Sequence, residues 1–157
     1  MGTIKITAED GHQFDAYLAE PKSESLRAAL IVVQEIFGVN SHIRSVADGY
    51  AAQGYLSIAP ALFDRAEPNV ELSYNSEDSK RGMGMAAQIG MDNMLKDVAA
   101  SIQYARQKWP ALKIGVVGFV WAEAWRGSLP LGWAQTLRLA TMADESRKTR
   151  MKPHAAR

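Results

Sequence analysis

Three short apolar runs, separated by stretches of helical periodicity, constrain the fold of this chain most strongly. The runs cover residues 28–34, 55–59 and 112–117, and each has the length and texture of a strand that is covered on both faces. Apolar residues recur at helical spacing between the first two runs, and segments 76–89 and 91–108 predict two further helices before the third. This alternation predicts an α/β fold in which three parallel strands are joined by right-handed crossovers.

The segment that precedes these runs has a different pattern. Residues 3–8 and 13–19 alternate between apolar and polar side chains, and a polar turn lies between them. We therefore expect an antiparallel hairpin at one edge of the sheet. Segment 62–75 carries no clear periodicity and is predicted to be a loop.

The composition argues against several classes of protein. At 157 residues the chain has the length of one domain, and its net charge of +1 gives no reason to expect a nucleic-acid partner. The chain has no cysteine and its three histidines show no ligand spacing, so we predict no metal and no cofactor. No apolar run reaches membrane-spanning length and the N-terminus lacks a signal core, so we expect no membrane contact and a cytoplasmic location.

A catalytic turn without its nucleophile follows the third apolar run. Within residues 113–121, an apolar strand runs into Gly118, where a strand-to-helix elbow would begin. In hydrolases that use such an elbow, the residue two positions after this glycine is the nucleophile. This chain has Val120 there, an alkyl side chain with no lone pair, and it has no cysteine that could replace the missing group.

The run Gln-Glu-Ile-Phe-Gly at positions 34–38 closely resembles the dienelactone hydrolase (carboxymethylenebutenolidase) family. Matching motifs extend the resemblance over residues 3–121, and they lie at 54–55, 59–63, 97–106 and 116–119. The resemblance implies an α/β-hydrolase fold, here incomplete, with the hairpin, three parallel strands and flanking helices. It also implies a Cys-His-Asp triad and the hydrolysis of small lactones or esters.

The resemblance assigns catalytic roles to four positions. Glu35 matches the glutamate that contacts the nucleophilic thiol, and a carboxylate there can hold or take the proton of a thiol. The backbone N–H groups of Ile36 and Trp121 match an oxyanion hole, which stabilises negative charge on a carbonyl oxygen. Val120 occupies the position of the family cysteine.

The resemblance also assigns substrate binding. Arg81, or alternatively Lys80, falls near the arginine that receives the substrate carboxylate, and a guanidinium suits this task because it offers a fork of donors. Phe37 is assigned to the same binding site. From the residues alone, two simpler interpretations stay open: Glu35 is a strand-end carboxylate paired with a nearby arginine, and Arg81 is a solvated charge on a helix.

The resemblance ends after position 121. Residues 122–157 form a Trp- and Arg-rich tail without counterparts of the triad Asp and His, and we expect this tail to be poorly packed beside the hydrolase-like part, 1–121. One permissible set of codons for 122–135, shifted by one base, encodes a glycine-rich elbow and helix typical of the family, so we interpret the tail as frameshifted or truncated. Run 112–117 would then lie at a sheet edge and favour self-association.

Three hypotheses of function follow from these residues. The first is that the chain has a dienelactone-hydrolase-like site that is catalytically inactive because Val120 replaces the nucleophile and the triad Asp and His are missing. The second is weak residual esterase activity through Glu35, Arg81 and the oxyanion donors. The third is a non-catalytic binding or regulatory module that pairs with an intact homologue.

Overall fold

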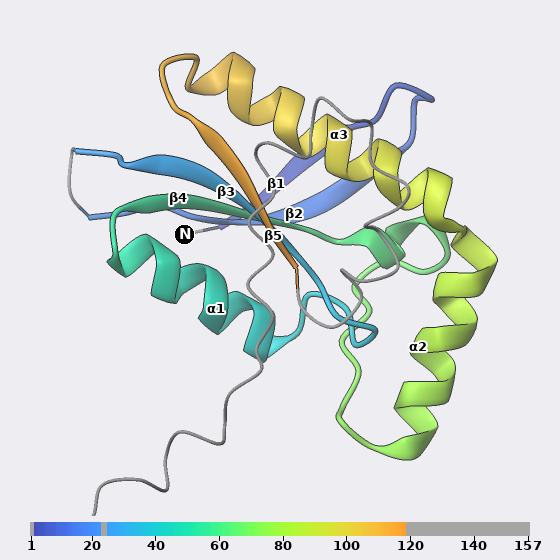
Figure 1. Ribbon diagram of the computed structural model, residues 1–157. Helices are drawn as coiled ribbons and strands as arrows, with labels where there is room; N and C mark the ends of the chain where they lie inside the picture. Colours follow the sequence, from blue (N-terminus) through green and yellow to red (C-terminus); the bar gives the residue numbers. More distant parts are fainter. Residues whose placement is uncertain (1, 23–24, 119–157) are drawn as a thin grey trace, which may run out of the picture.

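The computed structural model describes residues 2–22 and 25–118, and in this part of the chain five strands form one mixed sheet (Figure 1). The strands are β1 (Gly2–Thr7), β2 (Gln13–Ala19), β3 (Ala28–Val33), β4 (Tyr55–Pro60) and β5 (Ile114–Gly118). Their order across the sheet is β1-β2-β4-β3-β5. Strands β4, β3 and β5 are parallel, whereas β1 and β2 form an antiparallel hairpin that joins β4. The predicted hairpin and three parallel strands are therefore confirmed.

Helices cover both faces of the sheet. Helix α1 (Ser41–Ala52) packs on one face and α3 (Met91–Lys108) on the other, and α2 (Ser76–Ile89) stands beyond the carboxyl edge of the strands (Figure 1). The predicted bounds of α2 and α3 are confirmed. The prediction of a loop over 62–75 is wrong at its start, where Leu62–Arg65 forms a short 3₁₀ helix, η1, that buries Leu62 and Phe63.

Local sequence signals set the ends of the helices. The side chain of Asn40 accepts a hydrogen bond from the backbone N–H of Ile43 at 3.2 Å and caps α1. Asn75 caps α2 in the same way through the N–H of Asp78 at 2.8 Å. Gly54 follows α1 with φ of +90°, a conformation that favours glycine and turns the chain into β4.

The central strand β3 is buried on both faces, which explains why its sequence is continuously apolar. Ala29, Ile31 and Val33 belong to the larger core beneath α3, which also includes residues of η1 and α2. Val32 faces the opposite way and packs in a smaller core with Ile43 and other residues of α1. Alternate residues of one strand therefore serve two separate cores.

A charged network ties the hairpin to η1 and α3. The Arg65 guanidinium donates to both carboxylate oxygens of Asp97, at 2.8 and 2.7 Å, and it reaches Asp10 at 2.9 Å. Asp97 is fully buried, and burial raises the pKa of its carboxyl although the bonds to Arg65 oppose this shift. Asp10 is more exposed and also lies 3.7 Å from the Lys96 ammonium. The network joins elements that are far apart in the sequence.

The exposed end of this network predicts a pH-dependent contribution to stability. The hydrogen bond from Arg65 lowers the pKa of Asp10 from 3.8 to about 2. Because this folded-state pKa lies below the unfolded one, ionised Asp10 stabilises the fold above about pH 4, and protonation removes the contribution as the pH falls to about 2. We expect the difference in unfolding free energy between the unaltered chain and Asp10→Asn to shrink over this range, as urea unfolding at stepped pH would measure. A difference that stays constant would contradict the expectation.

Strand β5 lies at one edge of the sheet in the part of the chain that the structure describes. It pairs with β3 in parallel register, and no second strand among residues 2–22 and 25–118 pairs with it. For the whole chain, the expectation that run 112–117 lies at a sheet edge stays a prediction. The predictions for the tail, 122–157, concern residues outside the described part. Of the helices in the described part, none has the length and apolar character needed to cross a membrane.

Candidate active site at the carboxyl edge of the sheet

The register of two neighbouring strands determines where the candidate site lies. Val33, the last residue of β3, is paired with Gly118, the last residue of β5. Both strands run in the same direction, so their carboxyl ends lie side by side at one edge of the sheet. Glu35, Ile36 and Phe37 belong to the segment that follows β3. Val120 and Trp121, predicted to follow β5 at the same edge, lie outside the described residues.

The segment after β3 is held by the side chain of a buried glutamine. Gln34 is only 4% exposed, and its amide Nε2 donates to the backbone oxygen of Glu35 at 3.2 Å. Its Oε1 accepts a hydrogen bond from the N–H of Leu62 at 3.0 Å. Gln34 therefore satisfies backbone groups of two loops at once and fixes the start of the turn that carries Glu35. No pattern in the sequence predicts this role of Gln34.

A glycine allows the same turn to pack against the segment before α2. Gly38 has φ of +79°, and a Cβ at this position would lie 2.0 Å from the backbone oxygen of Val70. The N–H of Leu72 donates to the carbonyl of Phe37 at 2.9 Å. The turn is thus held by Gln34 on the side of the sheet and by the loop before α2 on the other side. Any larger residue at Gly38 would push the turn and this loop apart.

Glu35 is bound by a residue that the sequence analysis missed. The hydroxyl of Tyr74 donates to Oε2 of Glu35 at 2.5 Å, and the Tyr74 ring packs on Phe37 with ring centroids 4.3 Å apart. Partial burial of the hydroxyl and then the bond to Glu35 raise the pKa of Tyr74 to about 12, although the residue as a whole is 59% exposed. Among the described residues, the partner of Glu35 is therefore a phenol and not an arginine. Tyr74 lies in the segment predicted as a loop, where no periodicity drew attention to it.

Arg81 lies on α2, and its guanidinium is engaged away from Glu35. Nη2 of Arg81 donates to both carboxylate oxygens of Glu67, at 2.8 and 2.7 Å, and this hydrogen bond raises the pKa of Arg81. Both side chains are exposed, so the pair is of a kind that contributes little to stability. The neighbouring Lys80 is exposed as well. Arg81 is available to a ligand only if it leaves Glu67.

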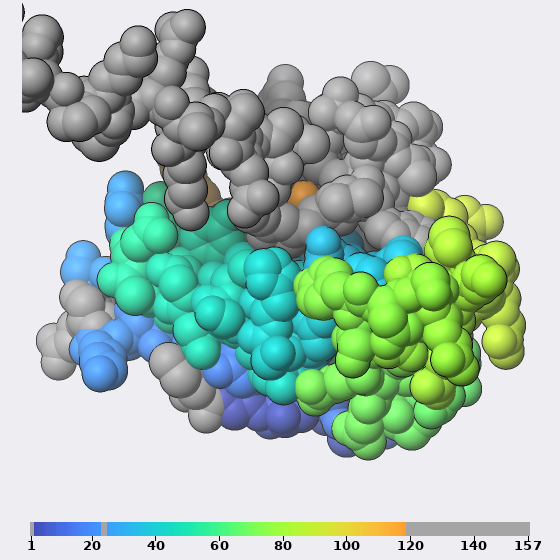
Figure 2. Space-filling view, turned by 90° about the horizontal axis from the view of Figure 1, so that it is seen from below, coloured from blue at the N-terminus to red at the C-terminus, as the bar shows by residue number. Residues whose placement is uncertain are grey.

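The next residue brings α2 against the site. A Cβ on Gly82 would lie 1.8 Å from the backbone oxygen of Ile36. The backbone of the helix therefore packs directly against the backbone of the turn, with no side chain between them. In Figure 2, the lime-coloured atoms of α2 lie beside the cyan atoms around residue 40. Arg81 is therefore one residue from the contact with the predicted oxyanion residue Ile36, while its own side chain points to Glu67.

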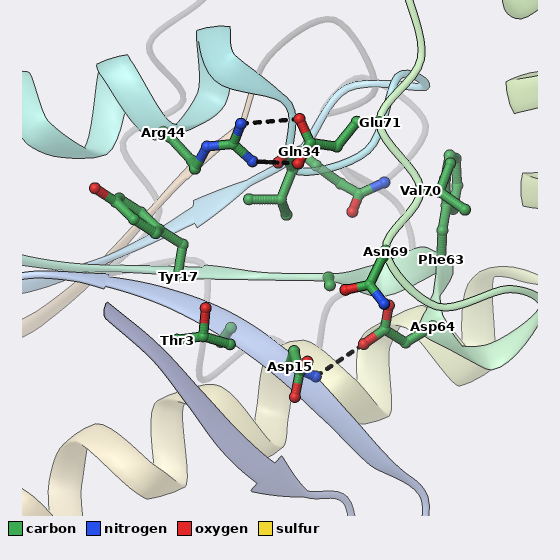
Figure 3. Close-up of a pocket in the computed structure, with 13 residues that line it drawn as sticks. Thr3, Asp15, Tyr17, Gln34, Arg44, Phe63, Asp64, Asn69, Val70 and Glu71 are labelled. Atoms are coloured by element: carbon green, nitrogen blue, oxygen red, sulfur yellow. Dashed lines mark hydrogen bonds and ion pairs between the residues drawn. The ribbon is translucent and has the colours of Figure 1, made fainter. Parts of the chain in front are cut away.

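A small cavity lies on the other side of Gln34 (Figure 3). Its volume is about 140 Å³, and neither Glu35 nor Arg81 lines it. Two pairs of its lining residues are bonded to each other: Arg44 donates to both carboxylate oxygens of Glu71, and Asp64 accepts from the N–H of Asp15 at 2.8 Å. The described residues contain no group of three or more His, Cys, Asp or Glu that could hold a metal ion. We therefore place the candidate site at Glu35 and not in this cavity.

Comparison with known proteins gives one consistent family. The sequence model of the Dienelactone hydrolase family matches residues 14–124. A provisionally named carboxymethylenebutenolidase of Synechocystis sp. is 40% identical over 134 residues, which are 82% of this chain and 54% of that protein. The carboxymethylenebutenolidase of Pseudomonas putida is 31% identical over 118 residues, covering 74% of this chain and 50% of that protein.

A solved structure gives the same result for the fold. The crystal structure of a provisionally named dienelactone hydrolase from Klebsiella pneumoniae subsp. pneumoniae superimposes with a TM-score of 0.58 at 27% identity. The superposition covers 77% of this chain and 51% of that one. The chain thus spans about half the length of the relatives that it matches.

Proposed function

The chain belongs to the dienelactone hydrolase family, and from this premise we propose that its carboxyl sheet edge is a hydrolase-type site for small lactones or esters that lacks covalent catalysis. The paired ends of β3 and β5 support this proposal most strongly, because they bring Glu35 to the edge from which residues 119–121 continue. The family resemblance places the nucleophile at position 120. This chain has valine there.

The chemistry of position 120 decides what such a site could do. Hydrolysis through an acyl-enzyme requires a side chain with a lone pair that attacks the carbonyl carbon. The isopropyl group of Val120 has none. Loss of the nucleophile in a hydrolase triad typically lowers the rate by several orders of magnitude, while hydrogen bonds that recognise the carbonyl remain. We therefore infer that this chain can bind such a substrate and does not turn it over.

Recognition would use groups that the turn and α2 bring together. The N–H of Ile36 would donate to the carbonyl oxygen, and Phe37 would offer an apolar surface. Arg81 would release Glu67 and bind a substrate carboxylate in its place. This exchange costs little free energy, because the ion pair between Arg81 and Glu67 is exposed. Glu35, held by Tyr74, would accept a hydrogen bond from the polar end of the ligand.

Turnover assays test this proposal. We expect the purified chain to hydrolyse dienelactone and p-nitrophenyl acetate at the buffer rate, and Glu35→Ala to give the same result. Ester hydrolysis that is above buffer and falls in Glu35→Ala would favour the residual esterase instead. Robust lactone turnover by the unaltered chain would refute the proposal that position 120 abolishes catalysis.

A second candidate function is pairing with another chain. It is favoured by β5, which within the described residues is hydrogen-bonded on one side only, so its other side could pair with a strand of a second copy or of an intact homologue. Sedimentation velocity over a hundredfold concentration range would detect self-association, and co-purification would detect the homologue. A monomer at all concentrations that captures no homologue would exclude this function.

A further inference from the structure

The hydroxyl of Tyr74 connects the candidate site to the segment that precedes α2. Its O–H donates to Oε2 of Glu35 at 2.5 Å, across 39 residues of sequence. The ring that carries it is held on two sides, because Phe37 packs on it at 4.3 Å and His42 meets it edge-on at 6.2 Å between centroids. These two ring contacts orient the hydroxyl toward Glu35, on a residue that is 59% exposed.

The backbone anchors both members of this pair. The N–H of Leu72 donates to the carbonyl of Phe37 at 2.9 Å, two residues from Tyr74 on one side and two from Glu35 on the other. Gly38 pairs with both Glu35 and Glu71 in short β-bridges. These contacts fix the distance between the two segments, so the phenol and the carboxylate face each other across a constant gap.

We propose that Tyr74 is a positioning residue for Glu35: its hydroxyl holds one carboxylate oxygen and thereby directs the other, Oε1, to the ligand. The inference rests on the proposed function, which supplies a ligand for Oε1 to meet. An ionised carboxylate only accepts hydrogen bonds, so one donor on Oε2 leaves Oε1 open to a donor from the ligand. Short O–H···O⁻ bonds are the stronger kind, and this one forms at the surface, where Tyr74 is 59% exposed.

The direction of the hydrogen bond does not change with pH in the physiological range. The pKa of Tyr74 is raised to about 12 by burial and by Glu35, so the phenol keeps its proton and continues to donate. Loss of the hydroxyl in Tyr74→Phe would leave the ring on Phe37 and remove the donor to Glu35, together with the hydrogen bond between the hydroxyl and the Asn40 side chain. This substitution therefore separates positioning of Glu35 from packing of the ring.

The side-chain conformation of Glu35 tests the inference directly. In the unaltered chain, NMR couplings between Hα and Hβ of Glu35 should show one rotamer, and in Tyr74→Phe they should show averaging over several. Tyr17→Phe is a matched control, because the Tyr17 hydroxyl also donates to a carboxylate, Asp48 at 2.8 Å, outside this site. Glu35 should keep its single rotamer in this control. A single rotamer in Tyr74→Phe, or averaging in the unaltered chain, would overturn the inference.

A titration of the phenols gives a second and independent readout. The Tyr74 midpoint, assigned by its loss in Tyr74→Phe, should lie near 12 and fall in Glu35→Gln. It should not fall in Asp48→Asn, which removes the partner of Tyr17. A Tyr74 midpoint that is the same in Glu35→Gln as in the unaltered chain would overturn the inference. Both readouts are independent of turnover, so lactone hydrolysis by the chain would refute the proposed function and leave them unaffected.

Discussion

Replacement of Asp97 by asparagine is expected to lower the free energy of unfolding by about 3 kcal/mol. The Asp97 carboxylate is fully buried and accepts two hydrogen bonds from Arg65, whose side chain is only 12% exposed. Asparagine keeps the shape and removes the charge, so the guanidinium stays buried beside a neutral amide. Removal of one partner from a buried ion pair costs this much because the other charge loses its buried counter-charge, and the Arg65 guanidinium would keep only Asp10, at the exposed end of the network. Urea unfolding followed by circular dichroism would measure the loss.

Asp10→Asn provides the matched control for this prediction. Asp10 contacts the same guanidinium at 2.9 Å, but from the exposed end of the network. We expect a much smaller loss of stability than for Asp97→Asn, since water can replace the lost carboxylate. Equal losses in the two variants would show that burial of Asp97 is not the source of the effect.

A pair of glycines on α2 gives the second large effect. Gly82→Ala should lower the free energy of unfolding by about 2 kcal/mol, because its Cβ would lie 1.8 Å from the backbone oxygen of Ile36 and α2 would have to move away. Gly84→Ala, two residues further along the same helix, meets nothing within 4 Å. It should instead raise stability by up to about 1 kcal/mol, the gain in helix propensity.

The opposite signs of the two glycine substitutions make the comparison specific to packing. Both variants gain the same propensity, so the difference between their unfolding free energies isolates the contact with Ile36. Urea unfolding of the two proteins under identical conditions measures it. If Gly82→Ala is as stable as Gly84→Ala, the close approach of α2 to the turn after β3 does not exist in solution.

Much of the fold could be predicted because its signals are local. The continuous apolar run of β3 follows from burial on two faces, and the Asn40 cap follows from one side chain and the backbone next to it. The bounds of α2 and α3 agree with the segments 76–89 and 91–108 that the sequence predicts as helices. The start of segment 62–75 was predicted as loop because four residues are too few to show a period, although tertiary packing buries Leu62 and Phe63.

The site could be predicted only in part, because its contacts join segments far apart in the sequence. Family resemblance pointed to Glu35, but nothing near it in sequence indicated Tyr74 as its partner. The pairing of Arg81 with Glu67 was likewise invisible, since an exposed helix charge has no pattern that identifies its partner. Gln34 lies within the recognised motif. Its role in holding the turn after β3 depends on the hydrogen bond from the N–H of Leu62, a residue far from it in the sequence.

A disulfide between positions 35 and 120 tests most directly whether the candidate site is assembled as proposed. The chain has no cysteine, so Glu35→Cys/Val120→Cys carries one pair of thiols, and disulfides form only when two Cα atoms lie within about 7 Å. Arg27→Cys/Val120→Cys is the control, because Arg27 precedes β3 and lies about 20 Å away along that six-residue strand. We predict that air oxidation closes an intramolecular disulfide in the first protein and leaves free thiols in the second, as thiol titration and mass spectrometry would show. Free thiols in the first protein, or equal closure in both, would contradict the placement of Val120 beside Glu35.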